Sequence, residues 1–452
     1  MTQAQVLDIL KTGANVFVTG EPGAGKTHTI HAYIEYLRKH KIEPAITAST
    51  GIAATHIGGM TIHSWSGIGI KQDMSAYELD ALATKEYVVK RIMKTKVLII
   101  DEISMLTPKM FSLVDTVCRM VKQNPEPFGG IQVVCVGDFF QLPPIKKAAP
   151  VLQSMELFAE KPATFVYESD TWEKLGMLVC YITEQHRQSD TDFLDLLSAI
   201  RSNTIEEGHY TTLQDRLITP AEIPEETTKL FSLNADVDMI NTRALAELPG
   251  DMRTYTMSTY GNDLIAASLQ KSCLSPEVLQ LKKDAVVLFT KNNPAKGFAN
   301  GTQGVVIDFN PLGYPIVETK SGKIIHLEPM DWSIEDQGKI KATISQIPLR
   351  LAWAITVHKS QGMSLDRAVM DLSSVFEYGQ GYVALSRVRS LKGLFILGIN
   401  NRALEVHPQI LHIDQVFRKQ SDAIADAFAK MKKTELTKMH KNFVVAVQGE
   451  WK

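Results

Sequence analysis

Short apolar runs alternate with segments of helical spacing over residues 1–180 of the chain. The apolar runs are NVFVTG (15–20), AITAST (45–50), VLII (97–100) and IQVVCV (131–136). After the first run, apolar residues recur with the spacing of one helix face at Ile30, Tyr33, Ile34 and Leu37. Strands that are apolar on both faces and alternate with helices form parallel sheets covered on both sides. The pattern therefore predicts an α/β fold built on a parallel sheet.

A second group of strands is predicted further along the chain, at 229–233, 285–289 and 393–397, and indicates a second parallel-sheet lobe. Between them, residues 301–349 show short alternating runs with turns at Gly313 and Gly322, which is typical of a small antiparallel β insertion. Residues 58–95 are polar, with helical spacing. We therefore expect a first lobe at 1–57 and 96–180 with an insertion at 58–95, a second lobe at 181–306 and 346–430 with an insertion at 307–345, and a basic tail at 431–452.

Composition places the chain among ordinary globular proteins. Hydrophobic residues make up 44% and charged residues 22% of the 452 positions, which excludes disorder over most of the length. No apolar run reaches the roughly 18 residues that cross a bilayer, and the first residues lack the basic flank and apolar core of a secretory signal. The four cysteines are far apart in the sequence, so we expect reduced thiols in a cytoplasmic protein and no zinc site.

The formal net charge is −2, from 48 basic and 50 acidic residues, which argues against a wholly basic protein that coats nucleic acid. A local cleft can still be positive. The last 25 residues hold six lysines and two glutamates, and such a run is more often a solvated helix face than a nucleic-acid contact.

A glycine-rich segment follows the first strand. Its sequence, GEPGAGKT (20–27), fits the phosphate-loop pattern G-x-x-x-x-G-K-[ST] between an apolar strand and a helix. In such a loop the backbone N–H groups surround a triphosphate at a helix N-terminus, so a chance glycine-rich turn is the weaker alternative. Lys26 is expected to reach the β- and γ-phosphates of ATP, and Thr27 to bind Mg²⁺. The predicted nucleotide-binding residues here are Gly20, Pro22, Gly23, Ala24, Gly25, Lys26, Thr27 and His28.

Polar side chains follow two further strands of the first sheet. Asp101 and Glu102 come directly after VLII, where Asp101 can hold Mg²⁺ through water and Glu102 can activate the attacking water. The alternative is a pair of surface acids in a turn. Gln141 follows the next strand, in GDFFQLPP (137–144), and can sense the γ-phosphate, although it could also be an ordinary loop glutamine. These residues predict hydrolysis of a nucleoside triphosphate.

Three later segments are weak signals when taken singly. They are QHRQ (185–188), TVHKSQG (356–362) and YVALSRV (382–388). In this order, after the phosphate loop and the acidic pair, they resemble the motif set of superfamily-one helicases. The most specific stretch, PFGGIQVVCVGDFFQLPP (127–144), resembles the signature of the petite-integration-frequency (PIF) helicase family, and the match runs from Gln5 to about Leu397.

The resemblance implies two RecA-like lobes, with a strand-separating wedge at 58–95 and an SH3-like domain at 307–345. It also implies a monomeric helicase that uses ATP and Mg²⁺ and moves 5′→3′ on single-stranded DNA to unwind forked or tailed duplex. The preferred DNA structure stays open, whether fork, G-quadruplex or RNA–DNA hybrid. In the family pattern Gln5 reads the adenine edge, Arg187 and Arg387 neutralise charge in the transition state, and Gln361 and Gly362 lie at the nucleotide.

The same resemblance supplies the candidate DNA contacts, which are Thr50, Thr61, His63 and Pro144 on the first lobe and Thr356, His358 and Lys359 on the second. Hydroxyls, imidazoles and a lysine suit phosphate oxygens and carry no base information. Trp65 and Phe139 could stack on bases in a way that tolerates any sequence. Both could instead be core residues. This interpretation is about as strong as stacking for Trp65 and stronger than stacking for Phe139.

Two other classes of protein share the phosphate loop. A small-molecule kinase needs one nucleotide lobe and a lid, and it leaves Arg187, Gln361 and Arg387 without a role. A nucleotide-gated switch does not need a base such as Glu102 beside Asp101. An ATP-driven DNA helicase is therefore the leading hypothesis, with its 5′→3′ direction resting on the resemblance alone.

Overall fold

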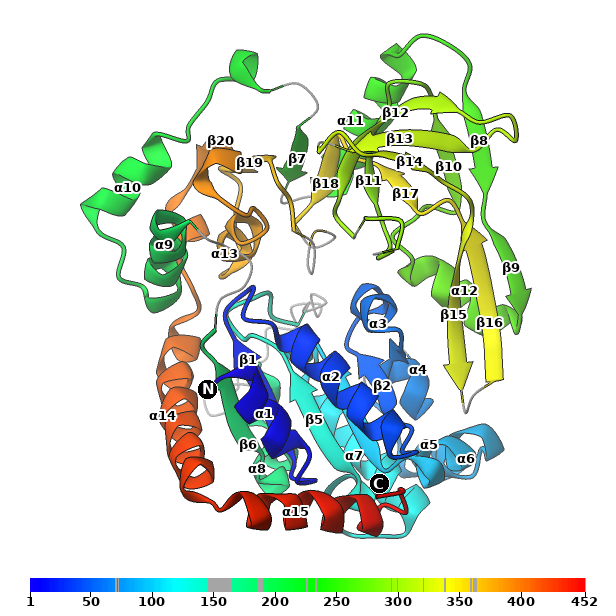
Figure 1. Ribbon diagram of the computed structural model, residues 1–452, viewed down its shortest axis with the longest axis vertical. Helices are drawn as coiled ribbons and strands as arrows, with labels where there is room; N and C mark the ends of the chain where they lie inside the picture. Colours follow the sequence, from blue (N-terminus) through cyan, green and yellow to red (C-terminus); the bar gives the residue numbers. More distant parts are fainter. Residues whose placement is uncertain are drawn as a thin grey trace, which may run out of the picture. The chain divides into compact units, whose positions relative to one another are not determined.

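The computed structural model describes residues 1–69, 71, 73–144, 164–184, 190–224, 227–231, 234–293, 295–298, 300–319, 321–336, 339–357, 360 and 364–451. By its internal contacts the chain divides into two compact units (Figure 1). The first consists of Met1–Gln185 and Ile413–Lys452, and the second of His186–His412.

A six-stranded parallel sheet forms the centre of the first unit. Its order is β3-β2-β4-β5-β1-β6, with bounds Met60–Thr61, Ala45–Ala48, Val97–Asp101, Gln132–Val136, Val16–Gly20 and Leu178–Ile182. All residues of β1 and β5 are buried, which explains why their sequences are apolar throughout. The parallel sheet predicted for residues 1–180 is confirmed. The proposed boundary at 180 falls inside β6, and the segment 58–95 contributes β3 to the sheet edge.

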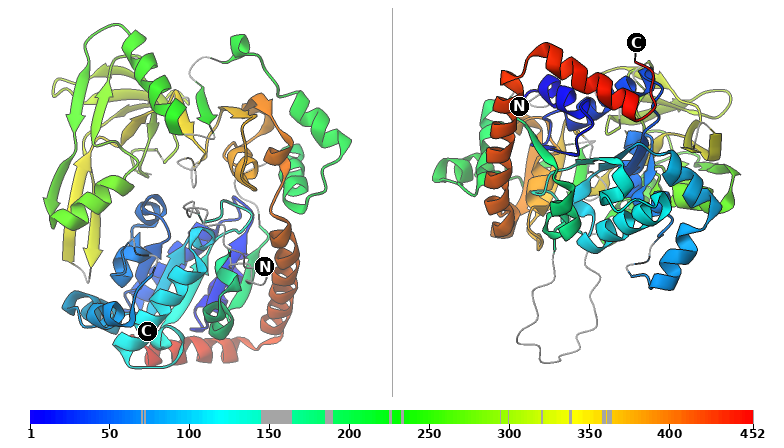
Figure 2. Two further views of the ribbon diagram at one scale, coloured as in Figure 1. Left: turned by 180° about the vertical axis from the view of Figure 1, so that it is seen from behind. Right: turned by 90° about the horizontal axis from the view of Figure 1, so that it is seen from below.

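Helices cover both faces of this sheet (Figure 2). Among the described residues up to 184, the α-helices are α1 (Gln3–Leu10), α2 (Lys26–Lys39), α3 (Gly51–Ile57), α4 (Ile62–Ser66), α5 (Ala76–Ala83), α6 (Glu86–Lys94), α7 (Pro108–Lys122) and α8 (Asp170–Leu175). On one face, α1 and α2 pack on Val16 and Val18, so that the predicted stripe Ile30–Leu37 is core. On the other face, Phe17 meets Trp172 of α8. The alternation along β1 therefore fixes which helices lie on which side.

Two C-terminal helices return to the first unit. α14 (Pro408–Lys430) crosses the boundary between the units at Ile413, and α15 (Lys433–Ala446) follows it. Phe443 and Val444 pack into the core formed by α1 and α2. By its contacts, the chain from Ile413 onward belongs to the first unit, whereas the sequence placed residues up to 430 in the second lobe. Most of the predicted basic tail forms the packed amphipathic helix α15. The lysines of α15 are exposed, as the prediction of a solvated helix face requires.

The second unit has a four-stranded parallel sheet, in the order β18-β7-β19-β20. Its strands are Ala354–Thr356, Thr228–Phe231, Ala368–Leu372 and Leu394–Ile399. The helices are α9 (Thr191–Ser202), α10 (Glu207–Gln214), α11 (Asn234–Glu247) and α13 (Gln380–Leu385). Asn241 fixes α11 to the sheet, because its side chain donates to Ala354 O at 2.8 Å and accepts from Ala354 N at 3.0 Å. The strands predicted at 229–233 and 393–397 correspond to β7 and β20, with 232–233 outside the described residues.

The rest of the second unit is antiparallel and larger than the predicted insertion at 307–345. The strands are β8 (Arg253–Thr256), β9 (Ser258–Gly261), β10 (Val278–Leu281), β11 (Val286–Phe289), β12 (Gln303–Phe309), β13 (Pro315–Thr319), β14 (Ile324–His326), β15 (Met330–Asp336), β16 (Lys339–Gln346) and β17 (Leu349–Leu351), with α12 at Asp263–Ser272. They form sheets ordered β14-β13-β12-β11-β17, β15-β16-β9 and β10-β8. The strand predicted at 285–289 for the parallel lobe is β11, which pairs antiparallel with β12 and β17. An apolar run shows that a strand is buried, but not which sheet it joins.

No helix among the described residues is long and apolar enough to cross a membrane.

Candidate functional site

The phosphate loop lies between β1 and α2, as its sequence predicts. Gly23 and Gly25 have φ values of +91° and +88°, and Gly25 is the N-cap of α2. A Cβ atom on Gly20 would lie 2.6 Å from the carbonyl oxygen of Ile182 in β6. Glycine is therefore required at Gly23 and Gly25 by the backbone conformation and at Gly20 by the neighbouring strand. The loop leaves the N-terminus of α2 available to an anion.

Lys26 begins α2 and turns back over the loop. Its Nζ donates to Gly20 O at 2.7 Å and to Glu21 O at 3.1 Å. The next two residues, Thr27 and His28, are exposed, while the loop residues Pro22 and Ala24 are buried. Two carbonyl groups therefore orient the amine at the start of α2, next to the loop that is predicted to bind phosphate.

The acidic pair stands at the end of β4. Asp101 is the last residue of the strand, and its carboxylate accepts a hydrogen bond of 2.9 Å from Glu102 N. Burial raises the pKa of Asp101 to about 6, although this hydrogen bond and the positive charge of Lys26 both act to lower it. Glu102 has a φ of 51°, in the left-handed region that costs roughly 1–2 kcal/mol for a non-glycine residue. The structure thus brings Asp101 within electrostatic reach of Lys26.

Gln141 follows β5, the strand between β4 and β1. Its side chain is 7% exposed, and its amide Nε2 lies 3.5 Å from Oδ2 of the fully buried Asp138. Because parallel strands end at the same edge of a sheet, the segments that carry Lys26, Asp101 and Gln141 meet there. The three positions come from three separate motifs, and the fold brings them to one edge.

Gln3, rather than Gln5, contacts the phosphate loop. The Gln3 side chain donates from Nε2 to Ala24 O at 3.2 Å, and a Cβ atom on Gly25 would lie only 2.0 Å from this nitrogen. Gln5 instead accepts a hydrogen bond of 2.8 Å from Thr2 N as part of a capping box at the start of α1. The T-x-x-Q spacing of Thr2 and Gln5 is a capping signal that the sequence already carried. Gln3 therefore makes a loop contact that the sequence did not predict, while the adenine contact of Gln5 stays a prediction.

The predicted DNA contacts of the first unit are half-buried at helix starts. The Thr50 hydroxyl accepts from Ala53 N at 3.3 Å, and Thr61, the N-cap of α4, accepts from Ser64 N at 3.2 Å. Burial lowers the pKa of the His63 imidazole below its ordinary value, which favours the neutral ring. These hydroxyls already serve as caps, so their contact with DNA stays a prediction.

Neither predicted stacking aromatic presents a free ring face. Trp65 is 2% exposed. Phe139 is 5% exposed and belongs to an aromatic cluster, with ring centroids 5.4 Å from Phe17 and 5.0 Å from Tyr167. Stacking on bases requires an accessible ring, and both residues are core residues in this structure. Pro144 is buried as well.

In the second unit, two of the predicted residues are described. Thr356 ends β18 and is 1% exposed. Arg387 is 2% exposed, and its guanidinium donates to Val383 O at 2.8 Å and to Ser386 Oγ at 2.7 Å. Arg387 is therefore a buried residue and not a surface arginine, and its role as a transition-state arginine stays a prediction. Arg187, His358, Lys359, Gln361 and Gly362 lie outside the described residues.

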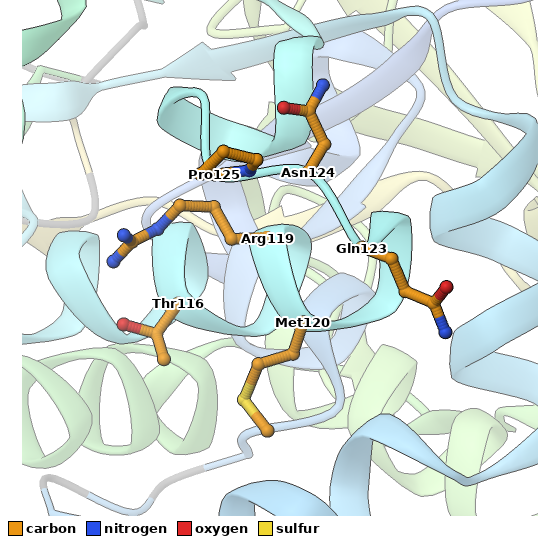
Figure 3. A pocket seen from close by; sticks show the side chains of 6 residues that line it. All are labelled: Thr116, Arg119, Met120, Gln123, Asn124 and Pro125. Carbon is orange, nitrogen blue, oxygen red and sulfur yellow. The ribbon is translucent and has the colours of Figure 1, made fainter.

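A hollow of about 360 Å³ opens on the C-terminal half of α7 (Figure 3). It is lined by Thr116, Arg119, Met120, Gln123, Asn124 and Pro125. None of these residues belongs to the phosphate loop or to the acidic pair. This hollow is therefore separate from the candidate nucleotide site.

Comparison with known proteins identifies relatives over nearly the whole chain. The model of the PIF1-like helicase family matches residues 2–209. The "ATP-dependent DNA helicase Pif1" of Psychrobacter sp. is 40% identical, over 99% of this chain and 75% of its own length. The "ATP-dependent DNA helicase PIF1" of Xenopus laevis is 35% identical, and this chain spans only 64% of it.

Solved structures of Pif1 helicases also match this chain over most of its length. Bacteroides sp. Pif1 in complex with ADP-AlF4 matches with a TM-score of 0.79 and 30% identity, over 92% of this chain and 96% of that chain. Bacteroides Pif1 bound to single-stranded DNA matches with a TM-score of 0.64 at the same identity and coverage.

Proposed function

Because the chain belongs to the PIF1-like helicase family, we propose that it is an ATP-dependent DNA helicase that moves 5′→3′ on single-stranded DNA. The observation that carries the proposal is the meeting of the Lys26, Asp101 and Gln141 segments at the ends of three neighbouring parallel strands. Family members named as ATP-dependent DNA helicases support the activity, and the Bacteroides Pif1 complex with single-stranded DNA supports the substrate.

The phosphate loop is proposed to bind the triphosphate of ATP. Its backbone N–H groups and the N-terminus of α2 attract the phosphates, and Lys26 moves from the carbonyls of Gly20 and Glu21 to the β- and γ-phosphates. Gln3, which already contacts Ala24 O, borders the same loop. Gln141, at the end of the neighbouring strand, is proposed to sense the γ-phosphate.

Hydrolysis is assigned to the acidic pair. Glu102 takes a proton from the attacking water, and its left-handed backbone conformation turns it away from the line of β4. Thr27 and Asp101 fit a Mg²⁺ site, because a hydroxyl and a carboxylate are oxygen donors and the Asp101 carboxylate is desolvated beside the loop. Mg²⁺ when bound neutralises charge on the phosphates, while Arg187 and Arg387 are proposed to add positive charge in the transition state.

The remaining parts of the site are proposed from the family pattern. Thr50, Thr61 and His63 contact DNA phosphates from the first lobe, and Thr356, His358 and Lys359 do so from the second. The segment 58–95 separates strands, and the SH3-like part of the β structure closes over the DNA. The monomeric state, the cytoplasmic location and the preferred DNA structure stay predictions.

The deciding experiment is ATP hydrolysis with and without single-stranded DNA. A helicase couples hydrolysis to its track, so the rate should rise strongly as DNA is added. Hydrolysis that does not respond to DNA would leave the small-molecule kinase or the nucleotide-gated switch as the better function. Lys26→Ala, which removes the phosphate contact, shows that the measured hydrolysis belongs to this site.

A further inference from the structure

Helix α14 packs against the strands that lead into the phosphate loop. Phe417 on this helix is 6% exposed, and its ring centroid lies 5.3 Å from that of Phe17 in β1. Ser421 accepts a hydrogen bond of 3.0 Å from the backbone N of Tyr181 in β6. Because β6 pairs with β1 as far as Gly20, α14 is fixed to the two strands that end at the loop (Figure 1).

Arg418 extends from α14 to the loop itself. Its guanidinium lies 4.2 Å from the ring centroid of Tyr181, and its Nη2 donates to the Tyr181 hydroxyl at 2.6 Å. Its Nε donates to Asp414 Oδ2 at 2.7 Å, and its Nη2 lies 3.9 Å from Oε1 of Glu21. Tyr181 is 2% exposed and the Asp414 side chain 13%. Tyr181 and Asp414 therefore orient the guanidinium beside Glu21, while the Arg418 side chain itself is 42% exposed.

Glu21 introduces a negative charge into a loop that attracts anions. It directly follows Gly20, and its backbone carbonyl is one of the two that hold the Lys26 amine. Like charges repel, so this carboxylate opposes the approach of a triphosphate, and a nearby guanidinium offsets the repulsion. The Glu21 side chain is 25% exposed, which leaves the pair partly screened by solvent.

We propose that Arg418 is a positioning residue for nucleotide binding, which lies beside the Glu21 carboxylate at 3.9 Å and offsets part of its charge so that the phosphate loop keeps its affinity for ATP. The inference rests on the proposed function, since it takes the loop to be the ATP site. Arg418 acts through Glu21 and touches neither ATP nor the attacking water. It should therefore affect nucleotide binding and leave the chemical step largely unchanged.

The test compares Arg418→Gln with the double variant Arg418→Gln/Glu21→Gln in the full chain. Arg418→Gln should raise the Kd of a fluorescent ATP analogue roughly two- to fivefold at low ionic strength, and less at high ionic strength. KM for ATP should rise in parallel, with kcat changed by less than about twofold. Removing the Glu21 charge in the double variant should restore the wild-type Kd, because no repulsion then needs compensation. Thermal denaturation of each variant checks that the fold is retained.

Arg38→Gln is the matched control, because Arg38 pairs with Glu43 at 2.7 Å on the exposed end of α2, away from the loop. Its Kd for ATP should equal that of the wild type. A normal Kd in Arg418→Gln overturns the inference, and so does a double variant that binds as weakly as Arg418→Gln, which would mean that Arg418 acts only through packing on Tyr181. Failure of the wild-type protein to bind ATP would instead refute the proposed function.

Discussion

Among single residues, Lys26 gives the first testable prediction, because its amine is expected to be essential for ATP hydrolysis. This amine donates hydrogen bonds to the Gly20 and Glu21 carbonyl oxygens, and its positive charge is expected to contact the phosphates. Lys26→Ala should lower kcat for ATP hydrolysis by on the order of 10²–10³ or more, since a charged donor aimed at the developing charge is lost. Binding of single-stranded DNA should stay measurable. Lys39→Ala, at the other end of α2, is the control in a steady-state ATPase assay, and normal turnover of Lys26→Ala would contradict the site.

Asp101 gives a prediction in pH. Its folded-state pKa of about 6 lies above the ordinary value of 3.8, so between these values the folded protein binds more protons than the unfolded chain. Stability of the nucleotide-free protein therefore falls as pH rises through this window, because the buried carboxylate becomes charged. Asp101→Asn should raise Tm above the wild-type value at pH above about 6, and the difference should vanish toward pH 3.8. A difference in Tm that is independent of pH would show that the carboxylate is not desolvated.

Arg387 is expected to contribute to stability as well as to catalysis. Its buried guanidinium donates to Val383 O and Ser386 Oγ, and Arg387→Ala leaves both acceptors without these donors. We expect a loss of about 2–4 kcal/mol in the free energy of unfolding. DNA-stimulated hydrolysis should also fall if the residue is a transition-state arginine. Urea denaturation and ATPase titration against DNA separate the two effects, and wild-type results in both assays would leave Arg387 without either role.

Residue identity predicted the position of the phosphate loop and the acidic pair in the fold, and it left the surroundings of two aromatic residues open. The phosphate loop and the acidic pair are local patterns in which strand, turn and helix follow one another, so the sequence alone placed them. The sequence favoured the core for Phe139 and left Trp65 open, and the structure buries both, with Phe139 packed on Phe17 and Tyr167. The contact of Gln3 with Ala24 O was not predicted, because no local pattern marks it.

At the scale of elements, the C-terminal segment is expected to stabilise the first unit. The ring of Trp451 stacks on His40 with centroids 5.5 Å apart, and Glu450 N donates to His40 O at 2.8 Å. Trp451→Ala should lower the free energy of unfolding by about 1–2 kcal/mol, since a half-buried aromatic contact is lost. Lys438→Ala, on the exposed face of α15, is the control. Equal urea midpoints for the two variants would show that the segment does not stabilise the unit.

Element type was easier to predict than the sheet to which an element belongs. The strands β1, β2, β4, β5, β7 and β20 were all expected, because apolar runs between turns mark buried strands. β11 was placed in the wrong sheet, and β8–β10 were not recognised. In β10 buried and exposed residues alternate, and in β9 all four residues are exposed, so neither strand shows a continuous apolar run.

At the scale of the whole molecule, the direction of movement is the property to test. We expect unwinding of duplex DNA that carries a 5′ single-stranded tail, because the chain belongs to the PIF1-like helicase family. A duplex with a 3′ tail of the same sequence should be unwound far less. The comparison must be made at one ionic strength, since phosphate contacts make DNA affinity depend strongly on salt. Equal unwinding of both substrates would contradict the proposed polarity.

The sequence by itself determined the α/β class, the phosphate loop and the acidic pair, because each depends on residues that are neighbours along the chain. The tertiary structure decided where α14 and α15 pack, which sheet β11 joins and which aromatics are buried. These outcomes depend on contacts between distant residues, such as the hydrogen bond between Tyr181 and Ser421, which are 240 positions apart. No local pattern encodes such a pairing, since many apolar helix faces could cover the same strands, and the choice is made only when the whole core is packed.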